Sequence, residues 1–75
     1  MYDSQNIALR IKQRARELKI QIRTLMADCE LGINTVSQLS SGRVISYVSL
    51  ALIAEHLDCS VDYLLGRTDN PEVNR

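Results

Sequence analysis

Apolar residues recur at helical spacing within residues 22–42, in two short runs separated by a break. The apolar positions of the two runs are Ile22, Leu25, Met26 and Cys29, then Val36 and Leu39. Each run has the spacing of a helix that buries one face. The second run ends at Gly42, a residue type that terminates helices in a left-handed conformation. Two short helices joined by about four residues predict a helix-turn-helix.

The register of this unit depends on which residue occupies the left-handed turn, where glycine is usual. With Gly32 at the turn, Asp28, Gln38 and Ser41 would be buried between the helices. With Glu30 at the turn, apolar residues take those interior positions. Burying three unpaired polar groups costs several kcal/mol, whereas a left-handed residue other than glycine costs about 1–2 kcal/mol. The sequence therefore predicts Glu30 at the turn and Gly32 as the N-cap of the following helix.

In this register, the helix from about residue 33 to residue 41 leaves four side chains uncovered: Ile33, Asn34, Ser37 and Gln38. Asn and Gln can form paired hydrogen bonds with the N6/N7 edge of adenine, Ser can contact several base groups, and an isoleucine suits the thymine methyl group. Small and amide side chains also occur on solvated helices. The composition of this face therefore fits both a DNA-reading surface and an ordinary solvent-facing one.

Three further helices are predicted around this unit. The first begins after Asp3 or Ser4, another follows Ser46, and a short one lies between Ser60 and Gly66. The expected inner positions of the three helices are Ile7, Ile11, Ala15 and Leu18, then Leu50, Ile53, Ala54 and Leu57 widened by Val48 and Leu52, and finally Val61, Leu64 and Leu65. The predicted fold is all-α, with five short helices.

The composition agrees with a single small helical domain. The chain has 75 residues, its only aromatic residues are three tyrosines, and it contains one proline. We expect the domain to span residues 1–67 and residues 68–75 to form a flexible tail. No apolar run approaches membrane length, and the N-terminus lacks the order of a signal peptide, so we expect a cytoplasmic protein without a membrane partner.

Residues that could support catalysis or bind a metal are few. Cys29 and Cys59 lack a CxxC spacing, and His56 is the only histidine, so we expect free thiols, no metal and no cofactor. The carboxylates are scattered, and the sequence has no phosphate-binding glycine-rich loop. We therefore expect that the protein is not an enzyme.

The charges are unevenly distributed along the chain, although the net charge is zero. Residues 1–43 contain seven basic and four acidic residues, a net charge of +3, and residues 44–75 carry −3. A basic half is what a polyanion-binding surface needs, and a solvated helix face accounts for it equally well.

Two stretches, LMADCELGINTVSQLSSGR and LALIAEHLDCSVDYLLGRT, resemble the lambda-repressor/Cro-like (XRE-type) DNA-binding domain, particularly in small regulators of Gram-positive bacteria and their phages. The similarity covers roughly residues 7–66. It implies a compact five-helix fold whose third helix enters the major groove. By this resemblance, base contacts come from Ile33, Asn34, Ser37 and Gln38, and phosphate contacts from Ile22, Arg23, Thr35, Ser41 and Arg43.

The chain departs from the family pattern at three places. Ile22 stands where the family often has a phosphate-contacting Gln, and Glu30 stands where a Gly is usual. The third helix also contains no Arg or Lys, so it cannot form the common bidentate contact to guanine. We therefore expect weaker binding, a preference for A·T pairs, or reliance on Arg23 and Arg43.

These features predict a sequence-specific transcriptional regulator, a repressor, in the cytoplasm of a bacterium or encoded by a phage and associated with the nucleoid. Its expected partner is double-stranded DNA, bound as a homodimer because one such domain makes few phosphate contacts. We expect the last helix, around Tyr63, to form the dimer contact, unless Tyr63 and Leu64 only cap the core. The alternative is a protein-interaction module or antitoxin on the same fold, with DNA binding secondary.

Overall fold

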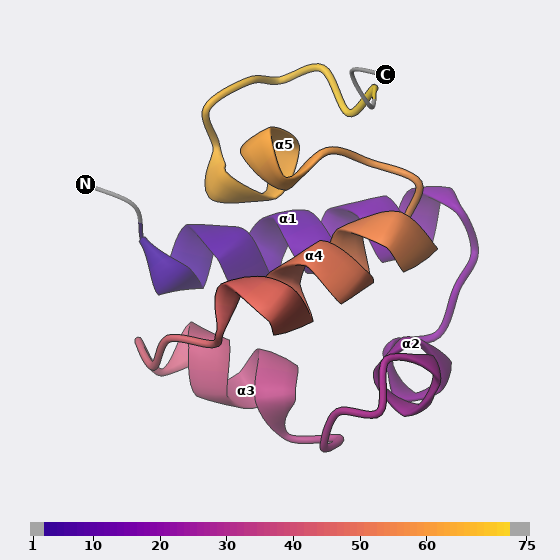
Figure 1. The fold of residues 1–75 in the computed structure, drawn as a ribbon, viewed down its shortest axis with the longest axis vertical. Helices are drawn as coiled ribbons and strands as arrows, with labels where there is room; N and C mark the ends of the chain where they lie inside the picture. Colours follow the sequence, from indigo (N-terminus) through magenta and orange to yellow (C-terminus); the bar gives the residue numbers. More distant parts are fainter. Residues whose placement is uncertain (1–2, 73–75) are drawn as a thin grey trace.

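The computed structural model describes residues 3–72, which form five helices and no strand. The helices are α1 (Ser4–Glu17), α2 (Ile22–Asp28), α3 (Thr35–Ser40), α4 (Tyr47–His56) and α5 (Val61–Leu65). α1 packs against α3 and α5, and α4 packs against α2 and α5. In Figure 1, α2 and α3 lie at the lower end of the molecule and α5 at the upper end, with α1 and α4 between them. The predicted all-α fold is confirmed.

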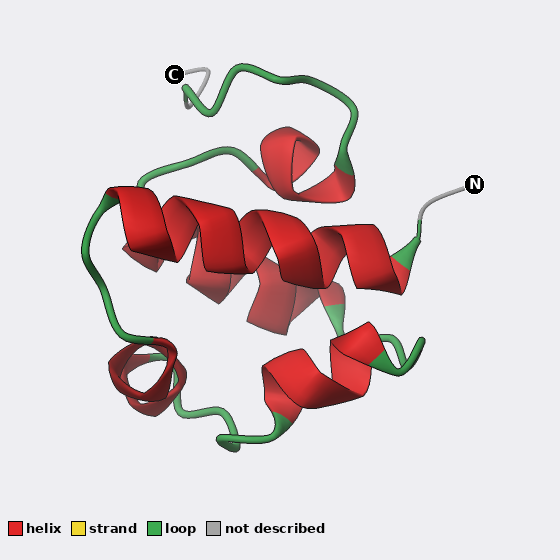
Figure 2. Ribbon diagram, turned by 180° about the vertical axis from the view of Figure 1, so that it is seen from behind, coloured by secondary structure: helices red, strands yellow, loops and turns green. Residues whose placement is uncertain are grey.

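The helix-turn-helix unit therefore stands apart from the C-terminal segment, as the view from behind in Figure 2 also shows. Among residues 3–72, no helix has the length and apolar character needed to cross a bilayer.

The core is built mainly from aliphatic side chains contributed by all five helices. Its largest fully buried members are Ile11, Leu25, Met26, Leu39, Ile53, Leu57 and Leu64. Two predicted core positions are wrong. Leu18 is 38% exposed because it is the C-cap residue, where α1 has ended. Val48 is 53% exposed because it precedes the core residue Leu50 by two positions, which places it on nearly the opposite side of α4.

Each helix is followed by, or ends at, a residue in the left-handed region. These residues are Lys19, Glu30, Gly42, Asp58 and Gly66, with φ between 50° and 94°. The next amide then bonds back to the helix, as in Ile20 N to Ala15 O (2.8 Å), Leu31 N to Met26 O (2.8 Å) and Cys59 N to Ala54 O (3.0 Å). This is the Schellman arrangement, in which an apolar residue after the turn packs back on the helix. Three of the five turns form without glycine, at a cost of about 1–2 kcal/mol each.

Arg14 joins α1 to the end of α4. Its Nε donates to the Leu57 carbonyl at 3.0 Å, and its Nη2 donates to the Asp58 carbonyl at 3.1 Å. Its Nη1 also pairs with Glu17 at 3.3 Å. A guanidinium at this place satisfies carbonyls that the helix end leaves free and faces the negative pole of α4.

Arg10 holds the segment that follows α5. Its contacts are the Thr68 carbonyl at 2.9 Å, the Asp69 carboxylate at 2.9 Å and the Tyr63 ring, whose centroid lies 4.8 Å from the guanidinium carbon. The Ser60 amide also donates to the Pro71 carbonyl at 3.0 Å. The beginning of the expected tail is therefore attached to α1 and α5. The flexibility of residues 68–75 stays a prediction, and residues 73–75 lie outside the described residues.

Candidate functional site

The turn between α2 and α3 has the register predicted from burial. Glu30 lies in the left-handed region with φ 57°, and Gly32 does not. The three polar side chains that the Gly32 register would bury, Asp28, Gln38 and Ser41, are all exposed. Glu30 is therefore the hinge residue, as predicted.

The start of α3 differs from the prediction. The helix begins at Thr35 rather than Ile33, and its N-cap is Asn34 rather than Gly32. The Gly32 carbonyl instead closes a tight turn, because it accepts from the Thr35 amide at 3.0 Å and from the Thr35 hydroxyl at 2.7 Å. Ile33 and Asn34 consequently stand on this turn, at the outer edge of the helix start.

Asn34 keeps its side chain free although it occupies an N-cap position. An N-cap Asn usually accepts from an amide of the first helical turn, and Asn34 makes no such bond. Gln38 is also exposed, and neither amide group bonds to another described residue. Ser37 and Gln38 follow Asn34 by three and four residues, so the three share one face. We call Ile33, Asn34, Ser37 and Gln38 the reading edge; all four side chains are exposed.

Two exposed arginines precede and follow the reading edge in the chain. Arg23 in the first turn of α2 and Arg43 after Gly42 are exposed, and neither forms an ion pair with a described residue. The Arg43 amide donates to the Gln38 carbonyl at 3.0 Å, which fixes the start of this loop against α3. Ser41 is exposed nearby, with its hydroxyl donated to the Ser37 carbonyl at 3.1 Å. Along the chain, one unpaired cation therefore precedes the exposed amide groups and one follows them.

Two other predicted phosphate contacts have no free side-chain donor. Thr35 is buried, and the Gly32 carbonyl accepts from both its amide and its hydroxyl. The Ile22 side chain is half-buried against the core and has no donor. Ile22 can offer only its backbone amide, which Gln21 does not cap with its side chain.

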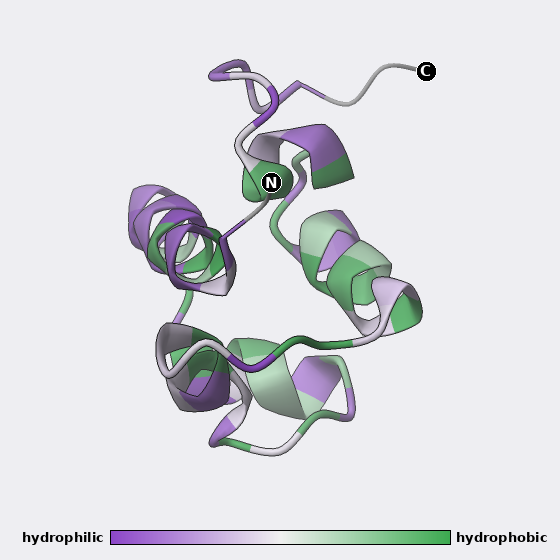
Figure 3. Cartoon of the chain, turned by 90° about the vertical axis from the view of Figure 1, so that its left-hand side faces the viewer, coloured by the Kyte–Doolittle hydropathy of each residue, from purple (hydrophilic) through white to green (hydrophobic). Residues whose placement is uncertain are grey.

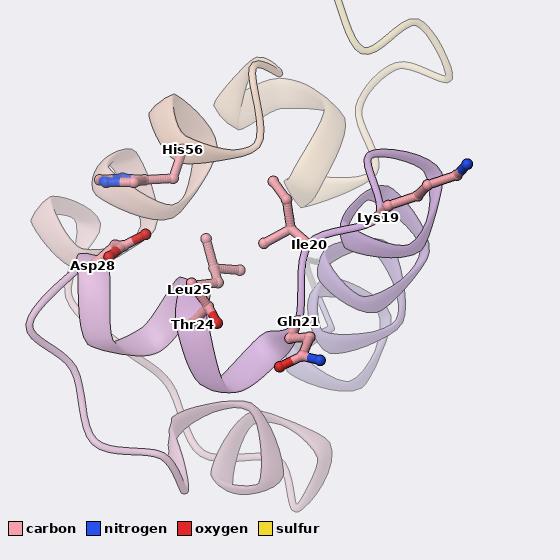
Figure 4. Close-up of a pocket in the computed structure, with 7 residues that line it drawn as sticks. All are labelled: Lys19, Ile20, Gln21, Thr24, Leu25, Asp28 and His56. Carbon is pink, nitrogen blue, oxygen red and sulfur yellow. The ribbon is translucent and has the colours of Figure 1, made fainter.

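A hollow of about 390 Å³ lies between the end of α1, α2 and the end of α4 (Figure 4). At its rim, His56 Nδ1 lies 2.9 Å from the Leu52 carbonyl, so this nitrogen carries the hydrogen and donates it. The buried Cys29 Sγ lies 3.5 Å from the same nitrogen. A nitrogen that already carries a proton cannot remove one from a thiol, so this pair lacks the arrangement of a Cys–His catalytic dyad.

The thiols are also held in their neutral form. Burial raises the pKa of Cys29, and the charges of Asp28 and Glu55 raise it further. Burial raises the pKa of Cys59 to about 11. Within residues 3–72, no three His, Cys, Asp or Glu side chains are grouped to hold a metal ion. The approach of Cys29 to His56 was not foreseen, because it joins two helices that no local spacing relates.

The comparison with protein families gives one match that bears on the reading edge. The Cro/C1-type HTH DNA-binding domain matches residues 10–70, which include α2 to α5 and most of α1. Comparison with curated proteins and with solved structures gave no match. The matched range contains the hinge, the reading edge and both flanking arginines.

Proposed function

Because the chain belongs to the Cro/C1-type helix-turn-helix family of DNA-binding regulators, we propose that it is a sequence-specific transcriptional repressor that occupies an operator. The start of α3 enters the major groove in this proposal, as the second helix of such motifs does. The observation that supports it is the reading edge, where exposed side chains with unengaged amide groups share one face of α3.

The contacts divide into two kinds. Asn34 and Gln38 form paired hydrogen bonds to adenine, Ser37 adds a shorter polar contact, and Ile33 packs on a thymine methyl group. α3 contains no Arg or Lys, so the readout favours A·T pairs. Arg23, Arg43, Ser41 and the Ile22 amide hold phosphates, which fix the orientation of the domain without reading sequence.

Two copies bind one operator in this proposal. Two arginines per domain neutralise few phosphates, so one copy binds weakly at physiological salt. Two copies on half-sites about one helical turn apart combine their contacts. The protein acts in the cytoplasm of a bacterium, or as a phage product there, on the DNA of the nucleoid.

The test is selection of bound sequences from a random duplex pool, followed by titration of the enriched duplex. The double variant Asn34→Ala, Gln38→Ala is expected to lose about tenfold or more in affinity, since each bidentate base contact contributes roughly 1–3 kcal/mol of discrimination. Arg43→Ala is the matched control, because loss of a phosphate contact weakens all duplexes alike.

Circular dichroism establishes that the variants fold as the wild type does. The absence of salt-dependent affinity of the wild type for any duplex would contradict the proposal. So would unchanged affinity and sequence preference in the folded double variant.

A further inference from the structure

Another hollow, of about 310 Å³, is bounded by parts of four helices and by the loop that follows α3. Figure 3 looks onto this side of the molecule, where the loop crosses below the starts of α1 and α4 and α5 lies above them. We call this space the apolar hollow. Its walls include Ser4 and Ile7 of α1, Leu39 of α3, Leu50 of α4, and Val61 and Leu65 of α5.

The wall of the apolar hollow is uncharged and consists mainly of hydrocarbon. None of the residues that line it is acidic or basic. Ile7, Leu39 and Leu50 are buried, whereas Val44 and Tyr47, which also line it, are each 83% exposed, so the hollow is open to solvent. An apolar molecule gains free energy by leaving water for such a wall, but an ion would lose its hydration without finding a partner.

Ser4 adds one hydroxyl group to this wall. The residue is only 8% exposed, and its side chain makes no hydrogen bond with a described residue. The start of α1 does not need it as a cap, because the Asp3 carboxylate accepts from the Gln5 amide at 3.0 Å. Among the described residues, no side-chain oxygen or nitrogen is both closed to solvent and unpaired, so the Ser4 oxygen keeps access to the hollow. This hydroxyl can both donate and accept a hydrogen bond.

We propose that the apolar hollow binds a small uncharged molecule that is mostly apolar and carries one hydrogen-bonding group, which pairs with the Ser4 hydroxyl. An apolar cavity of about 150 Å³ holds one benzene molecule. The apolar hollow has about twice that volume. It therefore suits a single ring with short substituents.

The apolar hollow is separate from the proposed DNA contacts. None of the residues that line it belongs to the reading edge, and neither Arg23 nor Arg43 is among them. The inference therefore goes beyond the proposed function. Binding of a small molecule can be measured on the free protein, so the result does not depend on whether the protein binds DNA.

The residues of α5 fall into two groups. Val61 and Leu65 are half-buried and line the apolar hollow. Tyr63 is only 5% exposed with the Arg10 guanidinium over its ring, and Leu64 is fully buried. The expected dimer contact through Tyr63 is therefore wrong. Tyr63 and Leu64 cap the core, which was the alternative left open by the sequence.

The test titrates the isotope-labelled protein with three probes of similar size and follows the backbone amides by two-dimensional NMR. The probes are 4-ethylphenol, 4-ethyltoluene, in which a methyl group replaces the hydroxyl, and the 4-ethylbenzoate anion. The two uncharged probes are expected to shift the amides around the apolar hollow in a saturable way, at about millimolar concentration for ligands of this size. The anion is expected to bind about tenfold more weakly or less, because the wall offers its charge no partner.

Two variants test the residues of the wall. Ser4→Ala is expected to weaken binding of 4-ethylphenol by about three- to tenfold, the usual contribution of one hydrogen bond, and to leave 4-ethyltoluene unaffected. Val61→Phe fills part of the hollow and is expected to abolish binding of both uncharged probes. Val48→Phe is the matched control, since Val48 is 53% exposed and lies outside the lining. It is expected to bind both probes as the wild type does, and circular dichroism establishes that each variant folds.

Three results would overturn the proposal. The first is the absence of saturable shifts around the hollow with either uncharged probe. The second is an equal effect of Ser4→Ala on 4-ethylphenol and 4-ethyltoluene, or wild-type binding by the folded Val61→Phe variant. The third is a set of shifts that follows protein concentration and not the probe, which would show that another copy of the chain fills the hollow.

Discussion

Thr35 and Asn34 have different roles at the start of α3. Thr35 closes the turn by donating its hydroxyl to the Gly32 carbonyl at 2.7 Å. Asn34 then has no structural hydrogen bond to make, although its position would allow one. A side-chain amide that is exposed and unengaged at the tip of a helix is suited to a paired contact with a base edge. Because Thr35 closes the turn, the Asn34 side chain is left available for the base contact that the proposed function assigns to it.

The thiol of Cys59 supplies a prediction on pH. Its pKa is raised to about 11 from an ordinary value of 9.0, chiefly by burial. Well below pH 9 the thiol is neutral in both the folded and the unfolded state. Between about pH 9 and 11 the unfolded chain releases this proton and the folded chain retains it, so stability falls as the pH rises through this range.

Urea unfolding at pH 8 and pH 10 measures this effect, with Cys59→Ala as the comparison. The wild type is expected to lose more stability between the two pH values than the variant loses. An equal loss in both proteins would show that Cys59 does not contribute.

Most inner positions could be read from the sequence because helical periodicity determines them. Leu18 and Val48 are not core residues, because α1 has ended at Leu18 and because Val48 lies on nearly the opposite side of α4 from Leu50. The partners of Arg10 and Arg14 could not be predicted. Both residues looked like solvent-facing cations, and their contacts lie more than 40 positions away along the chain.

At the level of elements, the left-handed turn at Glu30 sets the position of α3. Glu30→Gly is expected to raise the free energy of unfolding by about 1 kcal/mol, because glycine adopts φ 57° without the penalty of a Cβ atom. DNA affinity should not change, since Glu30 is not part of the reading edge. Urea unfolding and a duplex titration measure the two quantities.

Ala27→Gly is the control for this substitution. Ala27 is exposed inside α2, where glycine costs roughly 1 kcal/mol relative to alanine. If Glu30→Gly destabilised the protein as Ala27→Gly does, the positive φ at Glu30 would not be a source of strain.

The end of α4 depends on a residue of another helix. Arg14→Ala is expected to lower the free energy of unfolding by about 1.5–3 kcal/mol, since it removes two charge-assisted hydrogen bonds to the Leu57 and Asp58 carbonyls. Arg16 is exposed on the same helix, and its side chain forms no hydrogen bond or ion pair with a described residue. Arg16→Ala should therefore change stability by less than about 0.5 kcal/mol, as surface substitutions usually do. Similar losses for the two variants would argue against the bridging role of Arg14.

The helix-turn-helix could be predicted at this scale because its hinge follows from an energy comparison. The register with Gly32 at the turn would bury three polar side chains, and the register with Glu30 at the turn leaves them exposed. The start of α3 could not be predicted equally well, because the Thr35 side chain bonds to a carbonyl and replaces part of the first helical turn with a tight turn. Side-chain bonds to the nearby backbone compete with helix formation in this way.

For the molecule as a whole, part of the positive charge of the N-terminal half is engaged in contacts within the fold. Arg10 and Arg14 bind the Thr68–Asp69 segment and the end of α4, so they are not available to the proposed DNA contacts of α2 and α3. Arg23 and Arg43, which precede and follow the reading edge in the chain, are exposed and form no ion pair with a described residue. The net charge of +3 in the sequence therefore overstates the number of cations available for phosphates.

The salt dependence of DNA binding should reflect this small number. Two phosphate-neutralising side chains per copy predict a slope of log K against log salt of roughly −2 for a single half-site. Arg43→Ala should reduce the magnitude of this slope by about 1, and Arg14→Gln should leave it unchanged. Titrations between 50 and 200 mM salt (about the range in which such slopes are resolved) measure it. A slope unaffected by Arg43→Ala would place the phosphate contacts elsewhere.

The central claim is that Asn34 and Gln38 read adenine in the major groove. Replacing adenines of the selected duplex by 7-deaza-adenine tests it most directly, because this removes only the N7 acceptor on the major-groove edge. The account predicts that the wild type loses affinity at specific adenines and that the folded Asn34→Ala, Gln38→Ala variant is insensitive to the same changes. Equal sensitivity of the two proteins, or no effect of 7-deaza-adenine at any position, would contradict it.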